Sequence, residues 1–172
     1  MERINVVGTS CSGKTTLARA IAERLGLPHT ELDALFWGPG WKPVPPEVFA
    51  TRVADAVSGP RWVLDGGYST VRAAIWERAD TIVWLDYPMP LVLSRWARRT
   101  VARIRSQEEF WPGTGNRESI ANALRRDGVL WWILRTHRGR RRRLARDLAA
   151  RSGLRIVHLR SPAATRRWLA GV

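Results

Sequence analysis

The sequence predicts an α/β fold, in which one parallel β-sheet carries helices on both faces as a three-layer sandwich. Short apolar runs that are typical of buried strands alternate along the chain with segments of helical spacing. Such alternation indicates a parallel sheet, because each strand needs a crossover before the next parallel strand can begin. The length of 172 residues fits one domain, so we expect a single domain over residues 1–172.

The first strand and the first helix enclose a glycine-rich turn. The apolar run Ile4 to Val7 predicts the strand. Residues Lys14 to Leu25 predict the helix, because their large apolar side chains recur on one face and Gly26 follows as a stop. Residues His29 to Leu32 predict a second strand. The segment 36–46 predicts a loop, since it holds two Gly, four Pro and two Trp.

The remaining elements continue the alternation. Strands are expected at residues 61–64, 81–85 and 154–159. Helices are expected at residues 46–57, 91–105, 118–126, 129–151 and 162–169, with a further crossover helix between the third and fourth strands. A loop with Pro and Gly residues is expected at 106–117. Because ligands of such sheets bind beyond the carboxyl ends of the strands, we look for the site there.

The turn after the first strand carries a phosphate-binding motif. Residues 8–15 read Gly-Thr-Ser-Cys-Ser-Gly-Lys-Thr and match G-x-x-x-x-G-K-[ST], the P-loop pattern. The glycines allow the backbone N–H groups to approach phosphate oxygens, and the following helix adds its positive N-terminal end. The motif predicts that Mg-ATP is bound by Gly8, Thr9, Ser10, Cys11, Ser12, Gly13, Lys14, Thr15 and Thr16.

Three side chains around this loop have expected roles of their own. Lys14 would reach the β and γ phosphates, and the Thr15 hydroxyl would bind Mg²⁺. Asp65, at the end of the third strand, would hold the same Mg²⁺, often through water; the alternative is a carboxylate that only caps its own turn. Cys11 is either a reactive thiol, because a helix N-terminus lowers the thiol pKa, or simply a small loop residue.

A second group of residues suggests an acceptor site. Asp33 follows the second strand and would bind an acceptor hydroxyl or take its proton; the alternative is the N-cap of a short helix at 34–36. Trp37, Trp41 and Tyr68 would line an acceptor pocket, or else serve in packing alone.

The charge of the chain is unevenly distributed. The formal net charge is +14, but residues 1–90 hold nine basic and ten acidic side chains, whereas residues 91–172 hold 20 Arg against five acids. Genome bias explains the preference for Arg over Lys but not this asymmetry. The second half therefore predicts a surface that meets phosphates or another polyanion.

Arginines in helical spacing indicate a lid over the phosphates. Arg95 and Arg99 share one helix face, and Arg135 and Arg138 belong to a second stripe. Arginine stabilises the charge of a migrating phosphoryl group, so we expect Arg95, Arg135 and Arg138 to take part in catalysis. The loop 111–115 between the two helices suits an Arg-rich helical lid over about 96–140.

Other features of the sequence narrow the class of protein. Cys11 is the only cysteine, so an intrachain disulfide is excluded. No apolar run approaches the length of about 20 residues that a membrane helix needs. The chain enters its first strand almost at once, which leaves no room for a signal peptide. We expect a cytoplasmic protein without membrane contact, and the sequence does not indicate its oligomeric state.

The residues resemble the adenylate-kinase-like nucleotide and small-molecule kinases, and within them the bacterial topology modulation (FlaR-like) proteins. The segments that carry the resemblance are residues 32–41, 62–68, 79–86 and 115–118, beside the P-loop. The resemblance implies a five-stranded sheet of order 2-3-1-4-5, a mobile lid, and an adenine pocket near Arg95, Arg99 and the loop that begins at Arg160. The chain departs from adenylate kinases after Asp65, where Gly66-Gly67-Tyr68-Ser69 replaces Gly-Phe-Pro-Arg.

Three functions follow from these observations. The first is a kinase that moves the γ-phosphoryl group of Mg-ATP to a nucleotide or a small hydroxylated acceptor. The second is an ATP-regulated protein that binds nucleic acid through its basic C-terminal half, although no recognition helix, zinc site or RNA-binding signature is visible. The third is an NTPase switch whose lid binds a protein partner.

Overall fold

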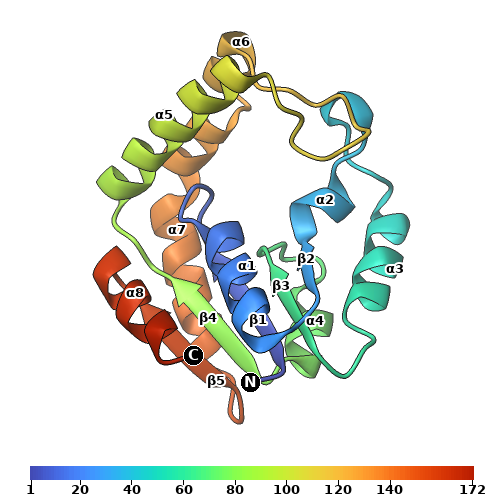
Figure 1. Ribbon diagram of the computed structural model, residues 1–172, viewed down its shortest axis with the longest axis vertical. Coiled ribbons are helices and arrows are strands. Elements are labelled where there is room, and N and C mark those ends of the chain that lie inside the picture. The colour runs from blue at the N-terminus through green and yellow to red at the C-terminus, as the bar shows by residue number, and fades with distance from the viewer.

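Five parallel strands form the centre of the protein in the computed structural model, which describes all residues 1–172 (Figure 1). Their order in the sheet is β2-β3-β1-β4-β5, and all neighbouring pairs are parallel. The strands are β1 (Arg3–Gly8), β2 (His29–Glu31), β3 (Trp62–Asp65), β4 (Thr81–Leu85) and β5 (Arg155–Leu159). The expected fold class and the strand order are confirmed.

Eight α-helices and one 3₁₀ turn connect and cover the strands. They are α1 (Lys14–Leu25), α2 (Leu32–Phe36), η1 (Pro39–Trp41), α3 (Pro46–Ala56), α4 (Arg72–Arg78), α5 (Met89–Ser106), α6 (Ile120–Leu124), α7 (Val129–Ala149) and α8 (Pro162–Ala170). Most bounds fall within two residues of the expected ones.

Two expected elements were too long. The second strand was expected to end at Leu32, but it ends at Glu31 because α2 begins there. The helix expected at 118–126 covers only Ile120–Leu124. Its start is fixed by Ser119, whose Oγ accepts a hydrogen bond from the backbone N–H of Asn122, and it ends because the backbone at Arg125 leaves the helical region with ψ 142°.

The sheet separates two apolar layers, because successive strand residues point to opposite faces. Ile4 and Val6 of β1 pack with α1 and with Val92 of α5 on one face. The other face carries Val7 and Leu64, which pack against α3, α4 and the C-terminal half of α7. Strands that are buried on both faces explain why their sequences are continuous apolar runs rather than alternating ones.

The helices α5, α6 and α7 form an arch on one side of the sheet, away from both chain termini (Figure 1). The long loop between α5 and α6 reaches across to η1 (Figure 1). The arch therefore lies over the carboxyl ends of the strands, where the P-loop and the ends of β3 and β4 meet. None of the helices is both long enough and apolar enough to cross a membrane.

Candidate functional site

The P-loop between β1 and α1 has the backbone that its glycines permit. Gly8 and Gly13 have φ of +155° and +91°, and a Cβ at Gly8 would lie 2.7 Å from the carbonyl oxygen of Leu85. The Lys14 ammonium donates to the carbonyl of Thr9 at 3.2 Å, which folds this side chain over the loop. The hydroxyl oxygens of Thr9 and Ser12 are buried without a hydrogen-bond partner. A polar cradle with unsatisfied hydroxyls and a lysine fits a phosphate group.

Beside the loop, Thr15 and Asp65 form the arrangement expected of a magnesium site. The Thr15 hydroxyl donates to Asp65 Oδ1 at 3.1 Å, and His29 Nε2 lies 2.8 Å from Asp65 Oδ2. The Asp65 side chain is 5% exposed, and its carboxylate does not bond to its own turn, so the turn-cap alternative is wrong. No three His, Cys, Asp or Glu residues are close enough together to hold a metal by themselves. Mg²⁺ fits a pair such as Thr15 and Asp65, because it takes most of its remaining ligands from phosphate and water.

The Cys11 side chain belongs to the same loop. Burial raises the pKa of its thiol, although the charges of Arg99 and Lys14 act in the opposite direction. The reactive-thiol alternative is therefore not favoured. Cys11 has φ +62°, a conformation that non-glycine residues seldom adopt, and it lines the cavity as part of the loop, which fits the alternative of a small loop residue.

Three arginines of α5 point along the cavity above the P-loop. Arg95 donates to the carbonyl of Ser12 at 2.5 Å and lies over the Tyr87 ring at 4.9 Å. Arg99 follows one helical turn later, and Arg103 one turn after that, with its guanidinium 3.9 Å from the Phe110 ring centre. The i, i+4, i+8 spacing places all three on one helix face. The first two are predicted site residues; Arg103 is not, although its spacing of four residues from Arg99 was a signal in the sequence.

A single cavity of about 920 Å³ joins these parts. Its middle is lined by the P-loop residues 10–16, and its end near α8 by Tyr87, Pro162, Thr165, Arg166 and Leu169. Its other end is lined by Glu31, Asp33, Trp37, Trp41, Arg103, Phe110, Trp111 and Glu118. The first end lies near the loop after β5, where the sequence resemblance placed an adenine pocket, and the second contains Asp33, where an acceptor was expected. We call them the base end and the acceptor end after these expectations.

At the acceptor end, Asp33 is the second residue of α2 and not its N-cap. Its Oδ1 accepts a hydrogen bond from the Tyr68 hydroxyl at 2.6 Å. Burial, together with the Asp33 charge, raises the pKa of Tyr68, so this hydroxyl stays protonated and can donate. The N-cap alternative for Asp33 is therefore wrong. The carboxylate is exposed and keeps its second oxygen free for a ligand.

The lid loop 107–119 closes over this end through Asn116. The Asn116 side chain accepts from the Trp41 backbone N–H at 2.9 Å and donates to the carbonyl of Gly38 at 3.0 Å. Phe110 and Trp111 pack edge-on against Trp41, with centroids 4.8 and 6.0 Å away. Trp41 was expected at the acceptor, whereas Phe110, Trp111 and Asn116 had no predicted role, because their contacts join segments far apart in the chain.

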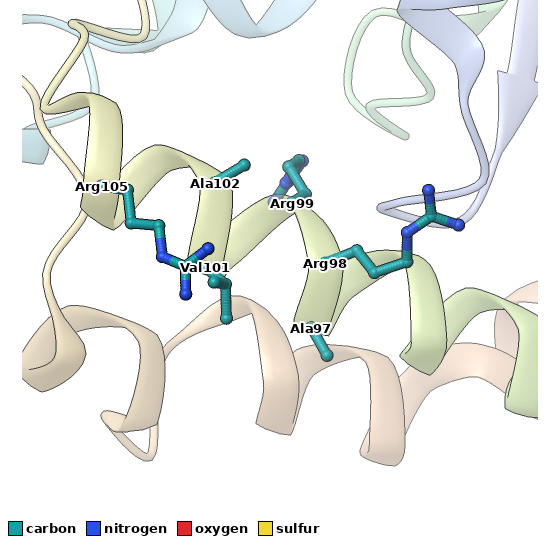
Figure 2. Close-up of a pocket in the computed structure, with 6 residues that line it drawn as sticks. All are labelled: Ala97, Arg98, Arg99, Val101, Ala102 and Arg105. Carbon is teal, nitrogen blue, oxygen red and sulfur yellow. The ribbon is translucent and has the colours of Figure 1, made fainter.

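A second hollow of about 660 Å³ lies along α5. Figure 2 shows its six lining residues: Ala97 and Val101 point from α5 toward the neighbouring helix, whereas Arg99 points to the opposite side. This surface holds neither a P-loop residue nor a strand end. We therefore place the functional site in the larger cavity.

Several predicted site residues lie elsewhere. Arg135 and Arg138 are exposed on α7 and do not line the cavity; Arg135 lies over the Trp131 ring at 5.6 Å. Arg160 is exposed at the end of β5, while its neighbours at 162, 165 and 166 line the base end. The stripe that contains Arg135 and Arg138 faces outward because Ile133 and His137, on the opposite side of α7, are buried.

The fold and the site together define a P-loop α/β protein with the architecture of small-molecule kinases. No family model matches the chain. Shikimate kinases from Synechococcus elongatus and from Synechococcus sp. are each 31% identical over 105 residues, which cover 52% of this chain and 55% of the relative. The chain thus matches about half the length of these relatives.

Solved structures resemble the chain over nearly its whole length. A sugar kinase from Janibacter sp. has a TM-score of 0.55 at 20% identity, with 99% of this chain and 93% of that chain covered. A gluconokinase from Sinorhizobium meliloti has a TM-score of 0.52 at 18% identity, with 99% and 94% covered. A shikimate kinase from Bacteroides thetaiotaomicron has a TM-score of 0.55 at 14% identity, with 99% and 95% covered. At these identities the likeness establishes the fold.

Proposed function

We propose that the protein is an ATP-dependent kinase that transfers the γ-phosphoryl group of Mg-ATP to a hydroxyl group of a small acceptor. The observation that carries the proposal is a single cavity that extends from the P-loop to a free carboxylate, Asp33, among aromatic side chains. Thr15, which lines the cavity, donates a hydrogen bond to Asp65 behind it. An NTPase switch without an acceptor would need only the P-loop with its Thr15–Asp65 pair, and not the Asp33 carboxylate.

Residues at and beside the cavity have separate parts in the proposed reaction. Bound Mg-ATP supplies the phosphoryl group. Lys14 and the α5 arginines neutralise the charge that spreads over the phosphoryl oxygens as it moves. Thr15 and Asp65 hold the magnesium ion. Asp33 orients the acceptor hydroxyl and takes its proton as the new P–O bond forms and the bond from the γ-phosphorus to ADP breaks, with ADP as the leaving group. Tyr68 holds the other carboxylate oxygen in place.

We retain Arg95 and Arg99 as phosphate ligands and add Arg103. The cavity is not lined by Arg135, Arg138 or Arg160 in this structure. These arginines take part in the proposed reaction only if further closure of the arch brings them to the cavity. Lids of kinases close over bound triphosphate and exclude water, so such a movement fits the proposed chemistry.

The relatives support the proposal. The partial matches are to proteins described as shikimate kinases, and the structural neighbours are described as sugar kinase, gluconokinase and shikimate kinase. All of these names denote phosphoryl transfer to small hydroxylated molecules. They give no support to the nucleic-acid alternative. The resemblance to adenylate-kinase-like topology modulation proteins remains a prediction about the finer family.

The test is transfer of label from γ-labelled ATP with magnesium to a panel of nucleoside monophosphates, nucleosides, sugars and cyclic alcohols. We expect a labelled acceptor with the wild-type protein, and a rate lower by about a hundredfold or more in Lys14→Ala, because this substitution removes a charge aimed at the phosphates. Label that appears only as free phosphate throughout the panel would contradict a kinase with an acceptor of these classes.

A further inference from the structure

The Asp65 carboxylate is held by a different element on each side. Asp65 is the last residue of β3, and its Oδ1 accepts a hydrogen bond from the Thr15 hydroxyl of α1 at 3.1 Å. Its Oδ2 lies 2.8 Å from Nε2 of His29, the first residue of β2. The His29 and Asp65 side chains are 14% and 5% exposed. Because both oxygens are engaged, the carboxylate cannot rotate without losing a contact.

The register of the sheet produces the contact between His29 and Asp65. His29 lies opposite Val63 on the neighbouring parallel strand. Asp65 lies two residues after Val63, and residues two apart on a strand point to the same face of the sheet. Val63 packs in the apolar layer that contains α1. The Asp65 side chain therefore points to the same side and meets Thr15 at the start of that helix.

His29 is also the only basic side chain within ion-pair distance of Asp65, since no lysine or arginine pairs with this carboxylate. An ionised carboxylate accepts but does not donate, so His29 donates through its Nε2–H. A neutral imidazole orients the carboxylate and leaves its negative charge available, whereas a lysine or arginine would neutralise it. Partners that orient metal-binding carboxylates in this way are typically worth about 10- to 100-fold in metal affinity.

We propose that His29 is a positioning residue for magnesium: its Nε2–H fixes the Asp65 carboxylate so that Asp65, together with Thr15, can hold the ion of Mg-ATP, directly or through water. His29 does not line the cavity, so it acts only through Asp65. The inference rests on the proposed function for the nucleotide and the ion, but nucleotide binding can be measured without phosphoryl transfer.

The test measures the affinity for ADP by calorimetry, in EDTA and at a series of Mg²⁺ concentrations. Two variants remove the donor: His29→Ala, and His29→Leu, which keeps more of the side-chain volume. In both we expect the Mg²⁺ concentration that gives half of the Mg²⁺-dependent tightening to rise about tenfold or more. The dissociation constant in EDTA should stay within about twofold of the wild-type value, because the P-loop contacts to phosphate remain.

Two further variants separate positioning from a purely structural role. His29→Gln, whose amide N–H can donate to the same oxygen, should restore most of the wild-type Mg²⁺ response. The matched control is His158→Ala. His158 Nε2 lies 2.9 Å from Oδ2 of Asp86, a carboxylate that is 3% exposed just after β4. Neither residue lines the cavity, so this variant loses the same kind of contact but should keep the wild-type Mg²⁺ response.

Several results would overturn the inference. One is an unchanged half-saturating Mg²⁺ concentration in both donor-free variants; another is an equal loss of ADP affinity with and without Mg²⁺. A His29→Gln variant that responds no better than His29→Ala, or a wild-type affinity for ADP that does not depend on Mg²⁺, would also overturn it. The kinase proposal fails separately, if no acceptor is labelled while the Mg²⁺ response of the variants follows the expected order.

Discussion

At the scale of single residues, the site depends on positions where the backbone leaves no space for a side chain and has a conformation that favours glycine. Gly66 follows Asp65, the proposed magnesium ligand, and has φ +134°; a Cβ there would lie 2.6 Å from Leu32 Cβ. Leu32 is itself fully buried at the start of α2. This close approach of the two strand ends brings Asp33 and Asp65 to one edge of the sheet, so glycine at this position serves the site through the backbone.

We expect Gly66→Ala to lower the free energy of unfolding by about 2 kcal/mol, because the new methyl group overlaps Leu32 and the backbone is strained. Urea denaturation followed by circular dichroism measures this. The matched control is Gly67→Ala, where the nearest atom would be an Arg140 nitrogen at 3.6 Å. Equal stability of the two variants would contradict the steric explanation.

At the scale of elements, the arch and the acceptor loop act as one unit. The η1 turn and the lid loop are separated by some seventy residues in the chain, but Asn116 contacts both the Trp41 N–H and the Gly38 carbonyl. Each of these bonds is worth about 1 kcal/mol when the partners are buried. Without them the packed rings of Trp41, Phe110 and Trp111 would belong to two separate loops, each free to move.

Asn116→Ala should therefore increase hydrogen exchange in both loops together, over residues 37–44 and 107–118, by about tenfold or more. Exchange followed by mass spectrometry locates the change. Asn122→Ala, in α6, is the control, because its side chain makes no hydrogen bond of this kind. Faster exchange in the lid loop alone would mean that the acceptor loop is ordered independently.

At the scale of the whole molecule, the strands connect the two apolar layers, since β1 and β4 contribute alternate residues to both. The polar interior is tied to the same strands: the Asn5 side chain donates to the Leu64 carbonyl and accepts from the Trp76 indole. A core shared in this way should unfold as one unit.

We expect a single thermal transition, and a rise of the midpoint by about 5 to 10 °C with Mg-ATP at a hundred times its dissociation constant. Chelation of magnesium with EDTA should reduce the rise, because the proposed magnesium ligands Thr15 and Asp65 would then lose the ion that joins them to the phosphates. Differential scanning calorimetry checks both points. Two separate transitions would show that the arch folds independently of the sheet, and would contradict a single domain.

The sequence by itself determined the sheet, its crossovers and the P-loop. These follow from local patterns, because a strand buried on both faces needs a continuous apolar run and a phosphate cradle needs glycines at fixed positions. It also placed Asp33 and Asp65 at strand ends. The carboxyl ends of parallel strands gather at one edge, so the two residues were expected near each other before any contact was known.

Only the tertiary structure decided which side chains meet in the cavity. Spacing along α7 showed that Arg135 and Arg138 share a face, but packing turned that face outward, because Ile133 and His137 supply the buried side. Packing also brought Asn116 and Glu118 to the acceptor end, by contacts with segments far away in the chain. Periodicity reports the relative direction of neighbouring side chains, whereas their partners depend on how whole elements pack.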